Sequence, residues 1–166
     1  MAVENLKSRA ITNADATPVV LSNSRVAGGG VRESVGTKQA AASASIGSTY
    51  RLARVPSNAR VSELLLSNDA FDTTGAADIG LYDIKDGAVV DADLFASAAL
   101  LTAVQKNVDV THESDVFGVE DAEKTVWEAL GLTADPYKEY DVALTLTAAN
   151  GAGATPDVTL KVRYVL

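Results

Sequence analysis

Cysteine is absent from the 166-residue sequence, and histidine occurs only once, as His112. The absence of cysteine excludes disulfides, thiolate metal ligands and cysteine nucleophiles, and it leaves the redox compartment open. A metal bound at His112 would need carboxylates as its other ligands, because no second histidine is present. The chain therefore has few residues for nucleophilic or metal-dependent chemistry.

Long hydrophobic runs are missing as well. The longest apolar segment, Leu94 to Val104, is well short of the roughly 20 residues that cross a bilayer. The N-terminus carries charge at Glu4, Lys7 and Arg9 without an apolar stretch behind them, which is not the pattern of a secretory signal. We therefore expect no membrane span and no membrane partner.

The composition that is present is that of one folded domain. Hydrophobic residues make up 47% of the chain and charged residues 22%, close to the averages for globular proteins. A domain of this size buries roughly 70% of the surface of its unfolded chain. A single hydrophobic core is expected.

Charge is distributed unevenly along the chain. Residues 1–60 contain eight Lys or Arg and three Asp or Glu, a net charge of +5, whereas residues 61–166 carry −13. Either solvated loops differ by chance, or the N-terminal part docks on an acidic surface. The basic residues are sparse, with Tyr50 as their only aromatic neighbour, and the acidic remainder would repel phosphate, so we expect no nucleic-acid partner.

The first 47 residues are rich in small and polar side chains, with the run Gly28 to Gly30 and the tract AAASAS from Ala40 to Ser45. Such a segment buries little apolar surface to offset the entropy of ordering. We predict that residues 1–47 form an extended N-terminal arm that becomes ordered on a neighbour. The candidate partner-binding residues in this arm are Lys7, Arg9, Arg25, Arg32 and Lys38.

From residue 48 to 166 the pattern is that of short strands in a β-sandwich domain. Strands are predicted over 48–55, 60–67, 77–84, 140–146 and 158–166, with a strand end near 108–112. In the last two, apolar residues alternate with polar ones, which indicates two half-buried antiparallel strands joined by the loop Asn150 to Pro156.

One segment has helical spacing instead. Val119 to Leu132 begins with acidic residues and reaches a plausible stop at Gly131, which predicts one amphipathic helix. Asp93 to Val104 has a weaker helical alternative. Many strands with one inserted α-helix favour a mainly β protein, an antiparallel β-sandwich of jelly-roll type.

The motifs that could carry chemistry each have a structural interpretation. The stretch DVTHESD, Asp109 to Asp115, surrounds His112 with carboxylates and hydroxyls, but we interpret it as a strand end with His112 exposed or hydrogen-bonded. The aspartates at 83, 86, 91 and 93 lack the order of a calcium loop. Trp127 and Tyr140 could stack on sugar rings, but Trp127 lies on the apolar face of the predicted helix, which predicts that it packs in the core. We therefore predict no catalytic, cofactor-binding or metal site.

Four stretches together resemble a known family. They are STYRLARVPSNARVSELLL, GAADIGLYDIKDGAVVDADLFASA, VDVTHES and AEKTVWEALGLTADPYKEYDVALTLT. These stretches are similar to virion proteins of tailed bacteriophages that are described as head decoration or cement proteins. The similarity runs from about Ile11 to the C-terminus, and RVPSNARV, ADIGLY and VWEALGLTADP are its most specific pieces.

The resemblance implies a non-enzymatic structural role without cofactors. It implies a β-sandwich on the outer face of the capsid, in particles that are assembled in the host cytoplasm. The expected partner is the major capsid protein, whose subunits the β-sandwich would bridge. The expected oligomeric state is a homo-oligomer, either a dimer or a trimer. Two alternatives stay open: a tail or baseplate subunit of a phage, and a carbohydrate-binding β-sandwich module.

Overall fold

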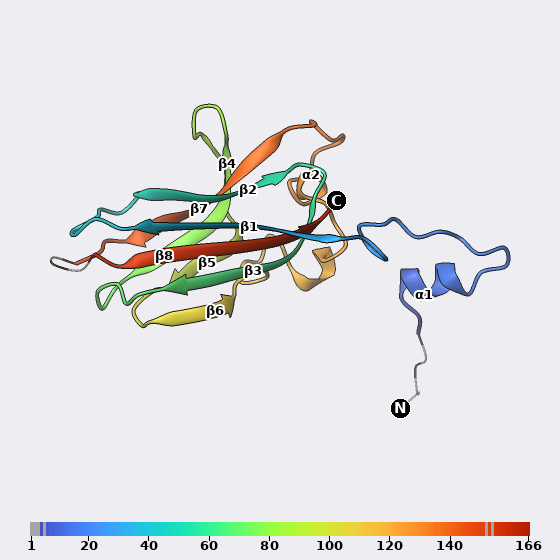
Figure 1. The fold of residues 1–166 in the computed structure, drawn as a ribbon, viewed down its shortest axis with the longest axis horizontal. Coiled ribbons are helices and arrows are strands. Elements are labelled where there is room, and N and C mark those ends of the chain that lie inside the picture. The colour runs from blue at the N-terminus through green and yellow to red at the C-terminus, as the bar shows by residue number, and fades with distance from the viewer. Residues whose placement is uncertain (1–3, 5, 152, 154) are drawn as a thin grey trace.

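The computed structural model describes residues 4, 6–151, 153 and 155–166, and over these residues eight strands form two four-stranded antiparallel sheets (Figure 1). One sheet has the order β1-β8-β3-β6 and the other β2-β7-β4-β5. The strands are β1 (Val31–Gln39), β2 (Thr49–Pro56), β3 (Arg60–Asn68), β4 (Ala76–Asp83), β5 (Val89–Leu100), β6 (Gln105–Asp109), β7 (Glu139–Ala148) and β8 (Asp157–Val165).

The strand pairing is nested. β1 pairs with β8, β2 with β7, β3 with β6 and β4 with β5, each in antiparallel register. This arrangement of eight strands in two packed sheets is the jelly roll. The predicted fold class is confirmed.

The core lies between the inner faces of the sheets. On β7, Tyr140, Val142 and Leu144 are at most 1% exposed, and on β8 Leu160 and Val162 are fully buried. The alternation that predicted these strands therefore identifies the faces that pack together. Burying a leucine or valine side chain contributes roughly 1.5–3 kcal/mol, so this layer supplies most of the stabilisation of the fold.

The two terminal strands do not form a hairpin with each other. β7 and β8 belong to different sheets, so the segment between them crosses from one layer of the sandwich to the other. Ala152 and Ala154 of the predicted loop lie outside the described residues. The turn at residues 57–59 likewise connects β2 in one sheet to β3 in the other.

The inserted helix is present but much shorter than predicted. In place of one helix from 119 to 132, there is a 3-10 turn, η1 (Val119–Asp121), and a single α-helical turn, α2 (Val126–Ala129). The backbone N–H groups of Val126 and Trp127 donate to the carbonyls of Ala59 and Ser57, at 2.8 and 3.0 Å. A continuous helix would need those N–H groups for carbonyls of its own preceding turn.

The residue that enters the core from this segment is Val126. Its side chain is buried, whereas Trp127, predicted to pack in the core, is only half-buried.

The helical alternative for 93–104 is wrong, because residues up to Leu100 belong to β5 and pair with β4. Among the described residues, no helix combines the length and apolarity needed to cross a bilayer.

The boundary of the N-terminal arm is corrected by the structure. Residues 31–39 form β1, which pairs along the whole of β8, and Ala40 and Ala44 lie in the core. β1 is held by backbone pairing, and Gly36 lies so close to the backbone of Leu52 on β2 that no side chain would fit there. Because β1 is held by backbone contacts, its polar side chains gave no sign in the sequence that it is a strand of the sandwich. The sandwich therefore begins near residue 31.

Residues 6–30 lie outside both sheets and project beyond one end of the sandwich (Figure 1). We call this segment the N-terminal lobe. Of the predicted arm, residues 1–3 and 5 lie outside the described residues.

The facing of β8 can be tested by introducing a charge. Leu160→Asp should prevent folding, because it buries an unpaired carboxylate between the sheets. Thr159→Asp, which points to the outer face of the same strand, is the matched control and should still melt cooperatively. Circular dichroism and thermal melting measure both. A soluble Leu160→Asp protein with a normal melting transition would contradict the assignment.

Candidate functional site

The N-terminal lobe is built around one short helix, α1 (Arg9–Ala14). Ser8 is its N-cap, and the Ser8 hydroxyl accepts from the backbone N–H of Ile11 at 3.4 Å. Lys7 Nζ lies 2.7 Å from Asp15 Oδ2, so an exposed ion pair connects the two ends of the helix. Contacts of this kind at the surface are weak, typically below about 1 kcal/mol.

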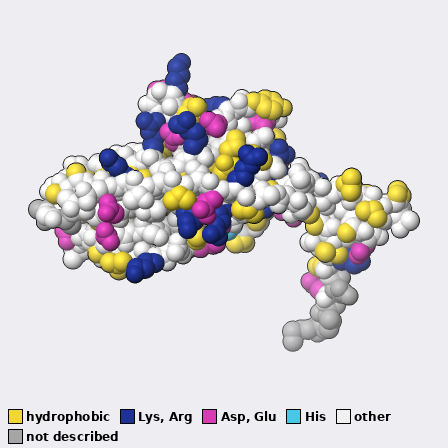
Figure 2. All heavy atoms as spheres, in the orientation of Figure 1, with side chains coloured by type: hydrophobic (Ala, Val, Ile, Leu, Met, Phe, Trp, Pro, Cys, Tyr) yellow, Lys and Arg dark blue, Asp and Glu magenta, His cyan; other side chains and the backbone are white. Residues whose placement is uncertain are grey.

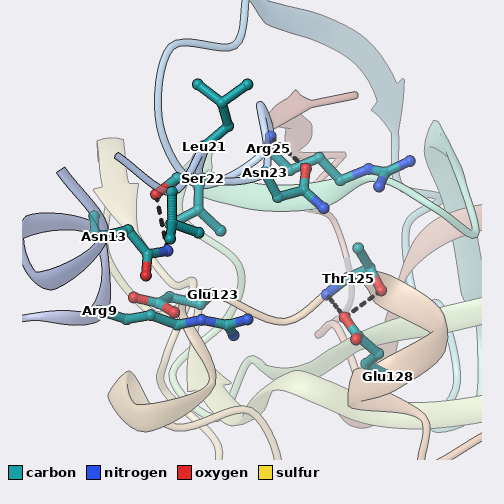
Figure 3. A pocket seen from close by; sticks show the side chains of 12 residues that line it. Arg9, Asn13, Leu21, Ser22, Asn23, Arg25, Glu123, Thr125 and Glu128 are labelled. Atoms are coloured by element: carbon teal, nitrogen blue, oxygen red, sulfur yellow. Dashed lines mark hydrogen bonds between the residues drawn. The ribbon is translucent and has the colours of Figure 1, made fainter. Parts of the chain in front are cut away.

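The chain after α1 folds back along the helix. The backbone N–H of Val20 donates to the carbonyl of Asn13 at 3.1 Å, and the Asn13 side chain donates to the Ser22 hydroxyl at 3.3 Å (Figure 3). None of the residues of α1 is buried. The lobe is therefore held by local hydrogen bonds without a hydrophobic core.

The lobe exposes large apolar side chains. Each of them is more than half exposed, and Leu21 is 91% exposed. These residues are Leu6, Ile11, Val19, Val20 and Leu21. Figure 2 shows hydrophobic side chains on the lobe where it projects from the sandwich. Single exposed apolar residues are ordinary, but a group of them on a small projection marks a contact surface.

The base of the lobe is attached to the sandwich. Arg60, at the start of β3, donates from Nε to the carbonyl of Arg25 and from Nη1 to the carbonyl of Ala122 at 3.2 Å. Gly29 lies against Val165 at the end of β8, with no room for a side chain. The lobe therefore begins at a fixed position beside β3 and β8.

A pocket of about 350 Å³ lies between the lobe and the segment of η1 and α2. Arg9 and Arg25 line it from the lobe, and Glu123, Thr125 and Glu128 line it from the sandwich (Figure 3). No ion pair joins these arginines to these glutamates within the described part of the chain. Opposite charges face each other across the pocket at a distance, which favours the observed placement of the lobe only weakly.

Glu128 also caps α2. Its Oε2 accepts from the Thr125 hydroxyl at 2.6 Å and from the Thr125 backbone N–H at 2.8 Å. These two hydrogen bonds, and then the charges of Arg25 and Lys124, lower the pKa of Glu128 from its usual value. Both hydrogen bonds favour the ionised carboxylate.

The five basic residues predicted from the sequence are not gathered in one cluster. Arg9 and Arg25 line the same pocket, and Lys7 is paired with Asp15. Arg32 and Lys38 lie exposed on β1, six residues apart, about 20 Å along the strand. The apolar residues of the lobe were not among the predicted binding residues, although the run Val19 to Leu21 in a polar segment was a signal.

A second polar cluster lies on the outer face of the β2-β7-β4-β5 sheet. Asp141 Oδ1 accepts from Arg54 Nε at 2.7 Å, and Asp141 Oδ2 lies 3.3 Å from Arg51 Nη1. The Asp141 side chain is largely buried, and both arginines are about half exposed. No sequence pattern could reveal this cluster, because its members come together only through the pairing of β2 with β7.

The stretch DVTHESD begins at Asp109, the last residue of β6, and continues as the loop that follows this strand. His112 Nδ1 lies 3.0 Å from the carbonyl oxygen of Phe117, and the two rings are stacked with centroids 5.1 Å apart. Of the two interpretations of His112, exposed or hydrogen-bonded to a neighbour, the structure shows the hydrogen-bonded one. Among the described residues, no three His, Asp or Glu side chains are grouped so that they could hold a metal ion.

The hydroxyls of this loop satisfy backbone groups. Thr111 Oγ1 accepts from the backbone N–H of Leu64 at 2.7 Å and donates to Asp109 Oδ1 at 2.5 Å. The buried Ser114 hydroxyl donates to the carbonyl of Leu94 at 2.5 Å. These bonds fix the loop across the two sheets, which is a structural role.

The aspartates at the end of β4, in the following turn and at the start of β5 accept backbone hydrogen bonds in the same way. Asp86 Oδ1 accepts from the backbone N–H of Ala88 at 2.9 Å, and Asp91 Oδ1 accepts from the N–H of Asp93 at 3.3 Å. Asp83 forms an ion pair of 2.9 Å with Lys138. A hydrogen bond from the backbone N–H of Lys85 is the larger cause that lowers the pKa of Asp83, and the contact with Lys138 is the second. Short acidic side chains commonly stabilise turns through such bonds.

Comparison with known proteins supports the fold. No protein-family model matches the chain, and no curated protein matches it. A chain in the capsid of Ralstonia phage GP4 is 20% identical, with a TM-score of 0.58, over 82% of this chain and 84% of that chain. A chain in the capsid asymmetric unit of cyanophage Pam1 is 16% identical, with a TM-score of 0.55, over 83% and 86%. The protein therefore has a jelly-roll fold that also occurs in phage capsids.

The cap on α2 predicts a pH dependence of stability. Because the pKa of Glu128 is lowered by folding, its contribution is present above the usual glutamate range and is lost as the pH falls through the lowered pKa. Glu128→Ala should lower the free energy of unfolding by about 1 kcal/mol at neutral pH. That difference from wild type should shrink in acid, as measured by urea unfolding at several pH values.

Glu123→Ala is the control for this measurement, since Glu123 is an exposed acid of the same segment that is not part of the cap. It should change stability little at any pH. A Glu128→Ala deficit that is the same at acid and neutral pH would contradict the proposed cause.

His112→Ala should lower the free energy of unfolding by about 1 kcal/mol, the typical contribution of one hydrogen bond. The variant should bind the same amount of metal as wild type, measured by elemental analysis of the purified proteins. Loss of a stoichiometric metal from the variant would contradict the structural role of His112.

Proposed function

We propose that this chain is a decoration, or cement, protein of a tailed-bacteriophage capsid. It binds the outer surface of the shell and stabilises it by bridging subunits of the major capsid protein. The observation that carries this proposal is the N-terminal lobe, a projection without a core that exposes apolar side chains from a rigid jelly roll. An adhesive protein needs both parts, one rigid and one able to reach a neighbour.

The similarity in fold supports the assignment to a virion. The two structures with a similar fold are phage capsids, and the matching region covers most of this chain and most of each matching chain. The sequence stretches that resemble head decoration proteins belong mostly to the sandwich, in β2 to β5 and β7. Sequence resemblance and fold together support a structural role in a phage virion.

The lobe can supply adhesion by two means. Burying each of its exposed leucines and valines on a neighbour would contribute up to roughly 1.5–3 kcal/mol. Arg9, which makes no ion pair with any described residue, adds attraction to an acidic surface. On a symmetric shell the same contact recurs many times, so modest single contacts add up to tight attachment.

No structural observation specifically favours the two alternatives, a carbohydrate-binding module or a tail or baseplate subunit. A sugar-binding face would use Trp127 and Tyr140, but Tyr140 is buried in the core and Trp127 is half-buried. The polar groups around His112 serve the loop that contains them. A tail or baseplate position remains the second proposal within the virion, and the location of the chain in intact particles distinguishes the two.

Decoration can be measured by adding the purified protein to phage shells assembled without it and counting bound copies after sedimentation. Wild type should saturate the shells, and the binding should weaken as salt rises, because charge attraction contributes. Leu21→Asp should bind at reduced occupancy, whereas Ile46→Asp, another exposed apolar site at the opposite end of the sandwich, should bind like wild type. Absence of wild-type binding would contradict the proposal.

Deletion variants test where the adhesive part ends. Removal of residues 1–22 should leave a cooperatively folding sandwich that decorates shells poorly, because no buried residue is lost within the described part of that segment. Removal of residues 1–39 should cause unfolding or aggregation, because it strips β1 from β8 and exposes a strand edge. Full occupancy of shells by the shorter deletion would show that the lobe is not adhesive.

A further inference from the structure

The jelly roll separates charge between its two edges. β1 and β2 lie together at one edge, and β5 and β6 are the outermost strands at the other. The β1–β2 edge carries four basic residues and one acid: Arg51 and Arg54 pair with Asp141, Glu33 pairs with Arg163, and Arg32 and Lys38 make no ion pair with any described residue. Residues 89–116, which include β5, β6 and the following loop, contain five acids and one lysine, a net charge of −4. We call this segment the β5–β6 side.

The β5–β6 side also exposes apolar residues. The loop after β6 runs along β5, since Glu113 N donates to the carbonyl of Phe95 and Ala96 bridges to Glu113, so the segment forms one side of the molecule. Its exposed large apolar residues are Val89, Val90, Leu100, Val104, Val108 and Val116. An apolar surface surrounded by acids is suited to an apolar, basic partner.

The charges on this side are uncompensated within the described part of the chain. Asp91, Asp93, Asp109, Glu113 and Asp115 make no ion pair there. The N-terminal lobe is complementary, because residues 6–30 have a net charge of +2 and expose five large apolar side chains. The two surfaces therefore both expose apolar side chains and carry net charges of opposite sign.

We infer that the N-terminal lobe of one copy docks on the β5–β6 side of a second copy of this chain. The contact is head to tail, because the two surfaces differ and lie on separate parts of the molecule. The basic β1–β2 edge, on the same copy as the lobe, favours this orientation over one that brings two acidic sides together. The inference rests on the proposed function for the adhesive role of the lobe, and it identifies the neighbour as another copy.

The contact can be tested in solution without shells. In sedimentation velocity at low salt, the full-length wild type should associate as its concentration rises, and higher salt should weaken the association. Leu21→Asp on the lobe and Val104→Asp on the β5–β6 side should each weaken it by about tenfold or more, because each places a charge in an apolar contact. Ile46→Asp, outside both surfaces, should associate like wild type.

Mixing the two variants gives the sharper result. A Leu21→Asp copy retains an intact β5–β6 side, and a Val104→Asp copy retains an intact lobe, so the mixture should form a dimer that neither variant forms alone. Failure of the mixture to associate would overturn the head-to-tail contact, and association of Val104→Asp by itself at wild-type strength would overturn it in favour of lobe-to-lobe pairing. A wild type that stays monomeric at every concentration would overturn self-association.

Shell binding and self-association in solution can fail independently, so the two proposals are tested separately. If Leu21→Asp fails to decorate shells while the wild type is monomeric in solution, the proposed function stands and the lobe docks on the capsid protein, which overturns this inference. If the wild type associates through these surfaces but never binds shells, the inference stands and the proposed function fails.

Discussion

The apolar layer between the two sheets is the constraint on which the rest of the structure depends. Leu64 and Leu160 from one sheet meet Tyr140 and Leu144 from the other, and all four are almost completely buried. The nested strand pairing brings these residues from distant parts of the chain into one layer. Because this layer holds the sandwich together, loops and projections can vary without loss of the fold.

The segments between strands are fixed by extending this layer and by satisfying backbone groups. Phe117 and Val126 join the same core cluster from the loop after β6 and from α2. Hydroxyls such as those of Thr111 and Ser114 take up backbone groups nearby. A histidine and several carboxylates therefore occur close together for reasons of loop structure, and their proximity alone is not a sign of catalysis.

The N-terminal lobe differs from these segments, because it contributes little to the stability of the fold and is positioned by its contacts with the sandwich. Arg60 and the contact of Gly29 with Val165 hold its base, while its apolar residues stay uncovered. A projection of this kind can bind a neighbour without unfolding its own domain, since the surface it buries is not part of the core. The core that stabilises the fold and the surface that we propose to be adhesive thus lie in separate parts of one chain.

Local patterns in the sequence predicted β2, β3, β4, β7 and β8, the core residues of β7 and β8, and the mainly β class, because period-two alternation reports directly which side of a strand is buried. The resemblance in sequence pointed to the phage head. Only the tertiary structure decided which strands pair, that β1 belongs to the sandwich, and that α2 ends after one turn. Each of these depends on backbone groups bonding across long sequence separations, as when Ala59 and Ser57 take the N–H groups of Val126 and Trp127. The charge asymmetry was visible in the sequence, but its arrangement as two opposite edges was set by the order of strands in the sheets.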